Sequence, residues 1–450
     1  MRARWAGFAW LTLGCAAVAA AALGETPRTA TRYVRFPSPA MTAYPAGFNY
    51  TSAHADLAVD SAGNAHIIKA CQANHIGNVE YRRWDRATRN WAGPVLSFGS
   101  GGQDWDAQYA YIAVDDADRV HVLYQHRVED PPWSGTPPFQ WYHAWCTNAS
   151  GSNPLALTNW VGPSVLTLAV GGDAGSMINV GSNVLLLARG SMDASGDGLK
   201  DIRMDHATWD GSSWTWSLVG CVITNTGHLG DLYGGIHSPR LTWDRGAGVL
   251  HLCFYDASVF SRGIAFSESG SPANPAPGTW SAPTRVVDPS QPNYLETEGG
   301  TGRPGSGMIV TLVWASDNRD ALNYEANFAR VRHPVTGWGA WTAAFPGDTR
   351  RMPTPYNSSY ANCFIRDGAG GLFASYDNVY ISHWDPISGT WADVFAGLPG
   401  GADAPIGKIA AYVAGYERES FLYYYRRSSQ TLYVGSYFLV APPGTLSVIR

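Results

Sequence analysis

Histidine, tyrosine and arginine side chains recur at the ends of alternating apolar segments along this sequence. His54 precedes the first such segment and His75 follows the second, while Tyr109 and Arg127 stand at the matching places of a later copy. An imidazole or a phenol can take or give a proton, and a guanidinium neutralises a carboxylate. This mixture suits β-elimination from a uronic acid, in which a weakly acidic proton beside a carboxylate is removed. We expect Arg127 to neutralise the carboxylate and Tyr109 to protonate the leaving oxygen. His54 or His75 would act as the base.

Six further side chains take equivalent places and are expected to contact the same substrate. They stand just before an innermost strand or just after the strand that follows it, where loops of a ring of sheets open beside the axis. They are His126, Arg189, His237, Tyr255, Tyr294 and Tyr360. The expected partner is therefore an anionic polysaccharide. A structural role for each side chain, as a polar cap or a packing group in the central channel, is the alternative.

One loop has the spacing of a calcium site. Its positions 1, 3, 5 and 9 carry the oxygen donors Asp193, Ser195, Asp197 and Asp201, with Gly198 at position 6 and the carbonyl of Leu199 at position 7. Calcium takes about six to eight oxygens, and a sharply turned loop can supply several of them. Met204 at position 12 excludes an EF-hand, and the loop resembles instead the DxDxDGxxD hairpin loops of integrin-type propellers. We expect a structural Ca²⁺ ion here, with a plain Asp/Gly turn as the alternative.

The elements that must position these residues are β-hairpins. Residues 57–68 recur as 112–123, 241–252 and 364–375, and each copy is an alternating strand, a tight Asp/Gly turn and a second alternating strand. A second hairpin rich in aromatic residues follows most copies, with a Trp opening its second strand, at 79–91, 202–214 and 379–391. Two hairpins per repeat make one four-stranded propeller blade.

Counting the repeats predicts the whole architecture. Blades are expected near residues 53–98, 108–167, 176–224, 236–288, 300–345, 357–396 and 405–441. The last blade has three evident strands, so residues 31–36 would supply its fourth and remove an open sheet edge. The prediction is an all-β fold, a seven-bladed β-propeller of four-stranded antiparallel blades whose ring is closed by the N-terminal strand. Six or eight blades are the alternatives. Residues 25–450 would form this single domain.

Composition agrees with this fold and narrows the partners. The 450 residues include 50 Gly, 28 Pro and 19 Trp, and 15% are charged. Frequent turns and aromatic residues on half-buried surfaces are typical of β-proteins. The formal net charge of −5, with no basic run, argues against a nucleic-acid partner. No segment after the first 24 residues reaches the roughly 20 apolar residues of a membrane span. We expect the protein to be a monomer.

The first 24 residues are expected to be a signal peptide. Arg2 and Arg4 precede an apolar run over residues 5–23, which ends in the small-residue site Ala22-Leu23-Gly24. The protein would then be secreted, periplasmic or on the cell surface. Cys15 lies in a loose lipobox, so a lipoprotein anchor is the alternative. Five cysteines remain after cleavage, so at most two disulfides can form.

The repeated hairpin Φ-x-Φ-Asp-x-x-Gly-x-Φ-x-Φ resembles the sialidase-like propellers with BNR repeats. The resemblance covers nearly the whole mature chain and implies the fold more than the function. Within that superfamily, His54, His75 and the segment Gly235-Ile-His237-Ser-Pro239 resemble the propeller polysaccharide lyases that include ulvan lyases. The resemblance implies an exported polysaccharide lyase without an organic cofactor.

Two other function classes stay open. A sialidase-like glycoside hydrolase would use an arginine triad, a Tyr/Glu nucleophile pair and an acidic Asp. Arg35, Tyr294 with Glu296, and Asp56 are the residues to which that alternative points. The sequence lacks the Asp-box Ser-x-Asp-x-Gly-x-Thr-Trp and a convincing arginine triad. The third class is a non-catalytic carbohydrate-binding or surface-recognition propeller, whose Trp and Tyr side chains stack on sugars.

Overall fold

Strands make up nearly all of the secondary structure in the computed structural model. The structure describes residues 33–35, 41–43, 55–73, 76–88, 90–98, 105–128, 139–146, 156–166, 175–181, 183–192, 200–224, 236–244, 247–256, 263–285, 295–301, 309–316, 325–333, 335–343, 364–366, 372–376, 380–385, 390–396, 406–414, 417–426 and 431–440. Within these ranges, the helical segments are two 3₁₀ turns, η1 (Leu157–Asn159) and η2 (Pro277–Thr279). In the same ranges, no helix has the length and apolar character needed to cross a bilayer. The all-β prediction is confirmed.

Two four-stranded units, which we name blade 1 and blade 2, form the first sheet. Blade 1 comprises β3 (Ala55–Val59), β4 (Ala65–Ala73), β5 (Ile76–Asp85) and β6 (Asn90–Phe98). Blade 2 comprises β7 (Trp105–Val114), β8 (Val120–Val128), β9 (Phe139–Cys146) and β10 (Trp160–Leu166). Neighbouring strands within each blade are antiparallel. A parallel bridge from Ile76 to Trp105 joins the two blades into one eight-stranded sheet.

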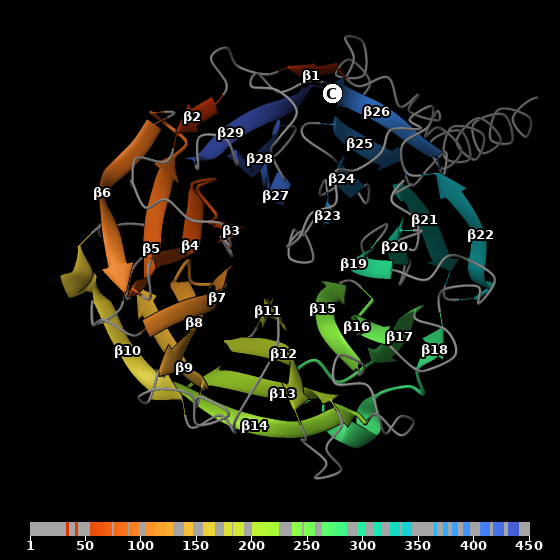
Figure 1. The fold of residues 1–450 in the computed structure, drawn as a ribbon, viewed down its shortest axis with the longest axis horizontal. Helices are drawn as coiled ribbons and strands as arrows, with labels where there is room; N and C mark the ends of the chain where they lie inside the picture. The colour runs from red at the N-terminus through yellow and green to blue at the C-terminus, as the bar shows by residue number, and fades with distance from the viewer. Residues whose placement is uncertain are drawn as a thin grey trace, which may run out of the picture.

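Four further sheets have four strands each, paired in chain order. Blade 3 comprises β11 (Gly175–Gly181), β12 (Val184–Met192), β13 (Lys200–Trp209) and β14 (Trp214–Ile223), and blade 4 comprises β15 (Ile236–Asp244), β16 (Val249–Asp256), β17 (Gly263–Ser269) and β18 (Thr284–Arg285). The other two contain β19 (Leu295–Thr301), β20 (Ile309–Ser316), β21 (Glu325–His333) and β22 (Gly337–Ala343), then β23 (Phe364–Arg366), β24 (Leu372–Tyr376), β25 (Tyr380–Asp385) and β26 (Thr390–Ala396). Figure 1 shows the sheets set around a common centre, as in a propeller.

The last sheet brings the two ends of the described chain together. It contains β27 (Ile406–Ala414), β28 (Glu417–Arg426) and β29 (Thr431–Val440), and two short N-terminal strands, β1 (Tyr33–Arg35) and β2 (Met41–Ala43). Both short strands pair with β29, β1 opposite Phe438–Val440 and β2 opposite Tyr433–Gly435. Of the strand expected at residues 31–36, the described part, Tyr33–Arg35, pairs with the C-terminal strand, and the structure adds β2 as a second short partner.

The predicted Asp/Gly turns form because each aspartate accepts backbone N–H bonds within its own hairpin. The N–H of Asn64 donates to Asp60 Oδ1 at 2.8 Å, and the N–H of Arg119 donates to Asp115 Oδ1 at 2.8 Å. The turn in blade 4 uses Asp244 Oδ1 in the same way. Asp118 has a φ of 57°, a left-handed conformation that aspartate tolerates better than most residues.

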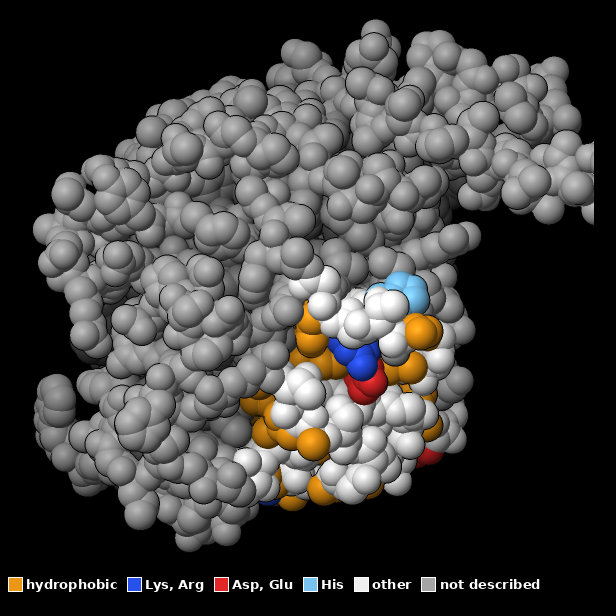
Figure 2. Space-filling view, turned by 90° about the vertical axis from the view of Figure 1, so that its right-hand side faces the viewer, with side chains coloured by type: hydrophobic (Ala, Val, Ile, Leu, Met, Phe, Trp, Pro, Cys, Tyr) orange, Lys and Arg blue, Asp and Glu red, His pale blue; other side chains and the backbone are white. Residues whose placement is uncertain are grey.

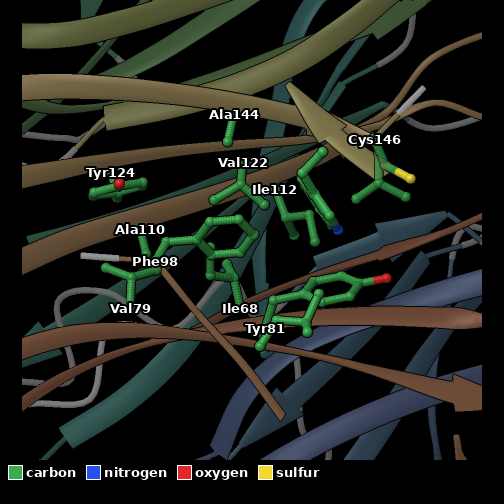
Figure 3. Packing of buried hydrophobic residues seen from close by; sticks show 13 residues of the cluster. Ile68, Val79, Tyr81, Phe98, Ala110, Ile112, Val122, Tyr124, Ala144 and Cys146 are labelled. Carbon is green, nitrogen blue, oxygen red and sulfur yellow. The ribbon is translucent and has the colours of Figure 1, made fainter. Parts of the chain in front are cut away.

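The hydrophobic core lies between neighbouring blades. One cluster joins Ile68 and Tyr81 of blade 1 to Ile112 and Val122 of blade 2, and Figure 3 shows these side chains facing one another between the two blades. A second cluster fills the space between blades 2 and 3, and a third that between blades 3 and 4. A fully buried aliphatic side chain contributes about 1.5–3 kcal/mol, so the stacking of blades holds the fold together.

Hydrogen bonds between the hairpin turns show that the first three blades are oriented the same way. The N–H of Ser61 donates to Asp118 Oδ1 at 2.8 Å, which ties the turn of blade 1 to that of blade 2. Asn179 of blade 3 donates to Asp116 Oδ1 at 3.1 Å in the turn of blade 2. The three turns therefore lie at one end of the molecule. The starts of the innermost strands and the ends of their partners lie at the opposite end, as the sequence predicts.

Candidate functional site

The hairpin of β7 and β8 places three of the predicted residues at its open end. Arg127 lies opposite Asp106, His126 lies opposite Ala107, and Tyr109 lies opposite Gln125. The register shifts between Ala107 and Tyr109, which marks a β-bulge in the innermost strand. Bulges are common beside functional sites because they re-aim side chains. The backbone thus brings Tyr109, His126 and Arg127 to one end of one hairpin.

The parallel bridge between blades 1 and 2 lies at this same end. Ile76 of β5 pairs with Trp105 of β7, and Trp105 pairs in turn with Val128, the residue after Arg127. Ala73 and Ile76 pair with each other and bracket the position of His75. His54 and His75 themselves lie outside the described residues. The chain on either side of His75 is therefore placed beside the start of β7.

Blade 4 repeats this arrangement at the corresponding end. His237 of β15 lies directly opposite Tyr255 of β16, so these two predicted residues are cross-strand neighbours. The register shifts between His237 and Arg240, which gives β15 a bulge near the same end as that in β7. Tyr294 and Tyr360 lie outside the described residues.

Arg189 is the predicted binding residue whose side chain the structure describes in most detail. It lies on β12 of blade 3, it is fully buried, and its Nε atom lies 2.7 Å from Oδ2 of Asp205 on β13. Asp205 is also fully buried, and its other oxygen, Oδ1, has no hydrogen-bond partner in the described part of the chain. Arg189 is therefore held by a carboxylate inside the blade, and its role toward a ligand stays a prediction.

The first residue of β11 is the meeting point of three blades. The N–H of Gly175 donates to the hydroxyl of Tyr111 in blade 2, and its carbonyl accepts from Arg240 Nη1 of blade 4 at 2.9 Å. A Cβ atom on Gly175 would lie 2.4 Å from the carbonyl oxygen of Ala188, so only glycine fits here. Arg240 and Asp205 are not among the residues predicted from the sequence. The signal available for both is a charged residue at a position whose alternation predicts burial.

Asp56, the candidate acid of the sialidase alternative, has a structural contact across blades. Its Oδ1 accepts the N–H of Leu57 at 2.9 Å, and its Oδ2 accepts the N–H of Ile112 in blade 2, also at 2.9 Å. Both carboxylate oxygens thus hold backbone N–H groups on the buried innermost strands. Of the other residues in that alternative, Arg35 lies in β1 and Glu296 in β19, and these two strands belong to separate sheets.

Two stacked tyrosines lie on the neighbouring strands β8 and β9 of blade 2. Tyr124 and Tyr142 are cross-strand partners, and their ring centroids lie 5.4 Å apart at an interplanar angle of 10°. Burial and the neighbouring Tyr142 raise the pKa of Tyr124 above its ordinary value, and burial raises the pKa of Tyr142. Both phenols therefore stay protonated at neutral pH.

The calcium loop is described at one of its five predicted ligands. Asp201 is the second residue of β13, it is fully buried, and it lies opposite Ser191. Asp193, Ser195, Asp197 and Leu199 lie outside the described residues. Within the described ranges, no group of three His, Cys, Asp or Glu residues is arranged to hold a metal ion. The Ca²⁺ ion stays a prediction.

No known family model matches the chain, and no curated protein matches it. Among solved structures, the fold is similar to that of the polysaccharide lyase Uly1, with a TM-score of 0.54 and 11% identity over 92% of this chain and 95% of the other. It is also similar to a protein of unknown function from Dyadobacter fermentans, with a TM-score of 0.50 and 11% identity over 90% and 99% of the two chains. A sialidase from Trypanosoma rangeli gives a TM-score of 0.45 and 10% identity over 93% of this chain and 60% of the other. The likeness to Uly1 and to the Dyadobacter protein shows that the chain shares their propeller fold, as the repeat predicted.

Proposed function

We propose that this protein is an exported polysaccharide lyase that cleaves a uronic-acid-containing polysaccharide by β-elimination. The observation that carries the proposal is the junction of blades 1 and 2. There the bridge from Ile76 to Trp105 sets the start of β5, which follows His75 in the sequence, beside the β7–β8 hairpin that carries Tyr109 and Arg127. Likeness of fold to a polysaccharide lyase over nearly the full length of both chains supports it.

The chemistry divides among these residues by the properties of their side chains. The guanidinium of Arg127 neutralises the uronate carboxylate, which lowers the energy of the carbanion that forms when the neighbouring C–H bond breaks. His54 or His75 takes the proton. The bond to the leaving oxygen then breaks, and Tyr109 donates the proton that this oxygen needs. The products are a chain with an unsaturated uronate at its new non-reducing end and a chain with a new reducing end.

Substrate binding would extend around the same end of the molecule. His237 and Tyr255, as cross-strand neighbours of blade 4, would contact sugar units further along the chain, together with His126, Tyr294 and Tyr360.

We further propose that the sheets close into a seven-bladed ring, in which β1 and β2 together complete the blade of β27, β28 and β29. The pairing of both short strands with β29 supports this closure, because it covers an edge that would otherwise be open. In this proposal, residues 1–24 are removed on export, the mature protein is a monomer, and the loop at 193–201 holds a structural Ca²⁺ ion.

Product analysis on a panel of polysaccharides tests the activity. The purified protein is incubated with several uronate polymers and with neutral polymers as controls, and both far-ultraviolet absorbance and reducing ends are followed. A lyase gives both signals together on a uronate polymer, because each cleavage creates one unsaturated uronate and one reducing end. Reducing ends without the absorbance would contradict the lyase and favour a hydrolase. Binding without new chain ends would favour a carbohydrate-binding protein.

A further inference from the structure

A stacked histidine recurs in three of the four blades whose side chains are described in detail. His66 stacks on Tyr81 in blade 1 with ring centroids 6.0 Å apart, and His251 stacks on Phe266 in blade 4 at 5.8 Å. In blade 2 the stacked partner of His121 is a second histidine, His143, at 5.4 Å and an interplanar angle of 3°. The histidine is therefore the same in all three blades, while its stacking partner is Tyr81, His143 or Phe266.

The three partner rings occupy the same place in their blades. Tyr81 pairs across strands with Ile68, His143 with Leu123, and Phe266 with Cys253. Each of these second-strand residues stands two positions after the histidine of its blade. Blade 3 has Leu185 at the histidine position and Asp205 at the partner position, so it has no ring pair. Among these four blades, blade 2 therefore has two imidazoles where the repeat has one.

The imidazole pair of blade 2 is tied to a buried carboxylate. His121 Nε2 lies 3.2 Å from Asp115 Oδ2, and His121 Nδ1 lies 3.2 Å from His143 Nε2. Arg119 Nε donates to the same oxygen of Asp115 at 2.5 Å. If His121 donates to Asp115, its Nδ1 atom is left as acceptor for the N–H of His143. One hydrogen then lies between the two rings, and both can be neutral.

The pair lies in the seam between blades 2 and 3. Trp214 of β14 contacts His121 edge-on at 4.6 Å, and Trp216 contacts His143 edge-on at 5.4 Å. Arg119 stacks over Trp209 of blade 3 at 4.1 Å and donates to Asn183 Oδ1 at 2.9 Å. Asp115 binds both His121 and Arg119, and these two side chains contact blade 3. The contacts between the two blades therefore depend on the hydrogen bonds that Asp115 accepts.

We propose that the His121 and His143 pair makes the seam between blades 2 and 3 an acid-sensitive joint, which loosens when the second imidazole takes a proton. One proton is accommodated, because a single imidazolium still leaves one hydrogen between the rings. A second proton places two N–H groups against each other at 3.2 Å, so the hydrogen bond is lost and two like charges meet in a buried site.

The electrostatic surroundings agree in direction. Burial lowers the pKa of His121 although Asp115 opposes this, and burial together with His121 lowers the pKa of His143 well below its ordinary value. Among the described residues, the charged groups acting on the pair are Asp115 and Arg119 from its own blade, while Asp205 and Arg189 of blade 3 form their own ion pair. The pKa values of both histidines are lower in the folded protein than the ordinary value of 6.5. The neutral pair therefore contributes its full stabilisation of the fold above pH 6.5, and this contribution is lost as the pH falls below it.

Blade 1 provides the matched comparison. His66 lies between Asp60 Oδ2 at 3.1 Å and the hydroxyl of Tyr81 at 2.7 Å. A protonated His66 donates to both, because a phenol oxygen can accept. The side chains around His66 therefore include no second imidazole that could compete for a proton, and both hydrogen bonds of His66 are compatible with its protonated form.

Two reciprocal substitutions test the joint. His143→Tyr gives blade 2 the ring of blade 1, and Tyr81→His gives blade 1 the pair of blade 2. Unfolding by denaturant is measured from about pH 7.5 to about pH 4.5, where each proton taken up on unfolding changes the unfolding constant about tenfold per pH unit. On unfolding in acid, we expect the His143→Tyr variant to take up about one proton fewer than the wild type, and the Tyr81→His variant to take up about one proton more. Unchanged slopes in both variants would overturn the proposal.

Two further measurements separate a coupled pair from a histidine that is simply buried. In NMR titrations, the pKa of His121 should rise in His143→Tyr, because the competing imidazole is gone. Hydrogen exchange of β8, β9, β13 and β14 should become at least tenfold faster, after correction for intrinsic rates, between about pH 7 and pH 5 in the wild type only. An unmoved His121 pKa, or equal exchange in the wild type and the variant, would contradict the joint. Should His143→Tyr fail to fold, the wild-type exchange and the Tyr81→His arm decide the question.

Discussion

Asp205 Oδ2 lies 2.7 Å from Arg189 Nε, and both side chains are fully buried within blade 3. The carboxylate stands where blades 1, 2 and 4 have an aromatic or imidazole ring, so an ion pair replaces a stacked ring pair in this blade. Removal of one member of a buried ion pair leaves the other desolvated, which typically costs about 3–5 kcal/mol.

We therefore expect Asp205→Ala and Arg189→Met each to lower the free energy of unfolding by about 3–5 kcal/mol in denaturant titrations. The double variant Arg189→Met/Asp205→Leu should be less destabilised than either single variant, because no buried charge is left. Arg83→Met is the control, since Arg83 pairs with Asp85 in a half-buried, solvated setting, and it should cost at most about 1 kcal/mol. A double variant whose loss equals the sum of the single losses would show that the pair is not coupled.

The proposed catalytic group predicts a characteristic loss of rate. Arg127→Ala removes neutralisation of the carboxylate, and Tyr109→Phe removes the proton donor while keeping the ring. Each should lower kcat/KM by about 10²- to 10⁴-fold on the polysaccharide that the panel identifies. The double variant should be little worse than either single variant, because residues that act as one unit are not additive.

Substitutions in blade 4 distinguish binding from chemistry. Tyr255→Phe and His237→Ala should raise KM with little change in kcat, since these residues lie on a separate sheet from the β7–β8 hairpin. If the Arg127 and Tyr109 variants keep near-full activity while the blade 4 variants lose it, the chemistry lies at blade 4 instead.

The calcium loop predicts a metal-dependent stability. Asp197→Ala should lose one bound Ca²⁺ per chain, measured by atomic spectroscopy, and should lower the melting temperature of the protein prepared in calcium. A ligand that binds only the folded state stabilises it by mass action, so chelator should lower the wild type to the level of the variant. Activity in excess calcium should be little affected. A melting temperature and a metal content that chelator leaves untouched would reduce the loop to a turn.

Closure of the ring predicts a dependence on the N-terminal strands. A mature protein lacking residues 25–40 loses β1, and the outer edge of β29 is then uncovered along Phe438–Val440, while its other edge still pairs with β28. We expect a lower melting temperature and a greater tendency to aggregate, measured by calorimetry and light scattering. A protein lacking residues 25–30 keeps β1 and should behave as the mature protein does. Identical melting of both truncated proteins would argue against closure.

Interactions within one hairpin could be predicted from the sequence. The turn aspartates Asp60, Asp115 and Asp244 accept N–H bonds from residues three or four positions away, so a local pattern is enough to specify them. The alternation of apolar residues gave the strands, and the repeat gave the stacking of four-stranded sheets. The pairing of Tyr33–Arg35 with the last strand followed from the shortage of one strand at the C-terminus.

Contacts between blades could not be predicted in this way. Asp56 holds the N–H of Ile112, and Gly175 holds Tyr111 and Arg240, across sequence separations of more than fifty residues. The partner of each such group depends on the angle and register at which two sheets stack, and these depend on the whole ring. The sequence by itself determined the elements and the end of the fold where His, Tyr and Arg side chains gather. Only the tertiary structure decided that Asp205 holds Arg189 and that His121 meets a second imidazole, because both depend on side chains from separate strands buried in the same seam.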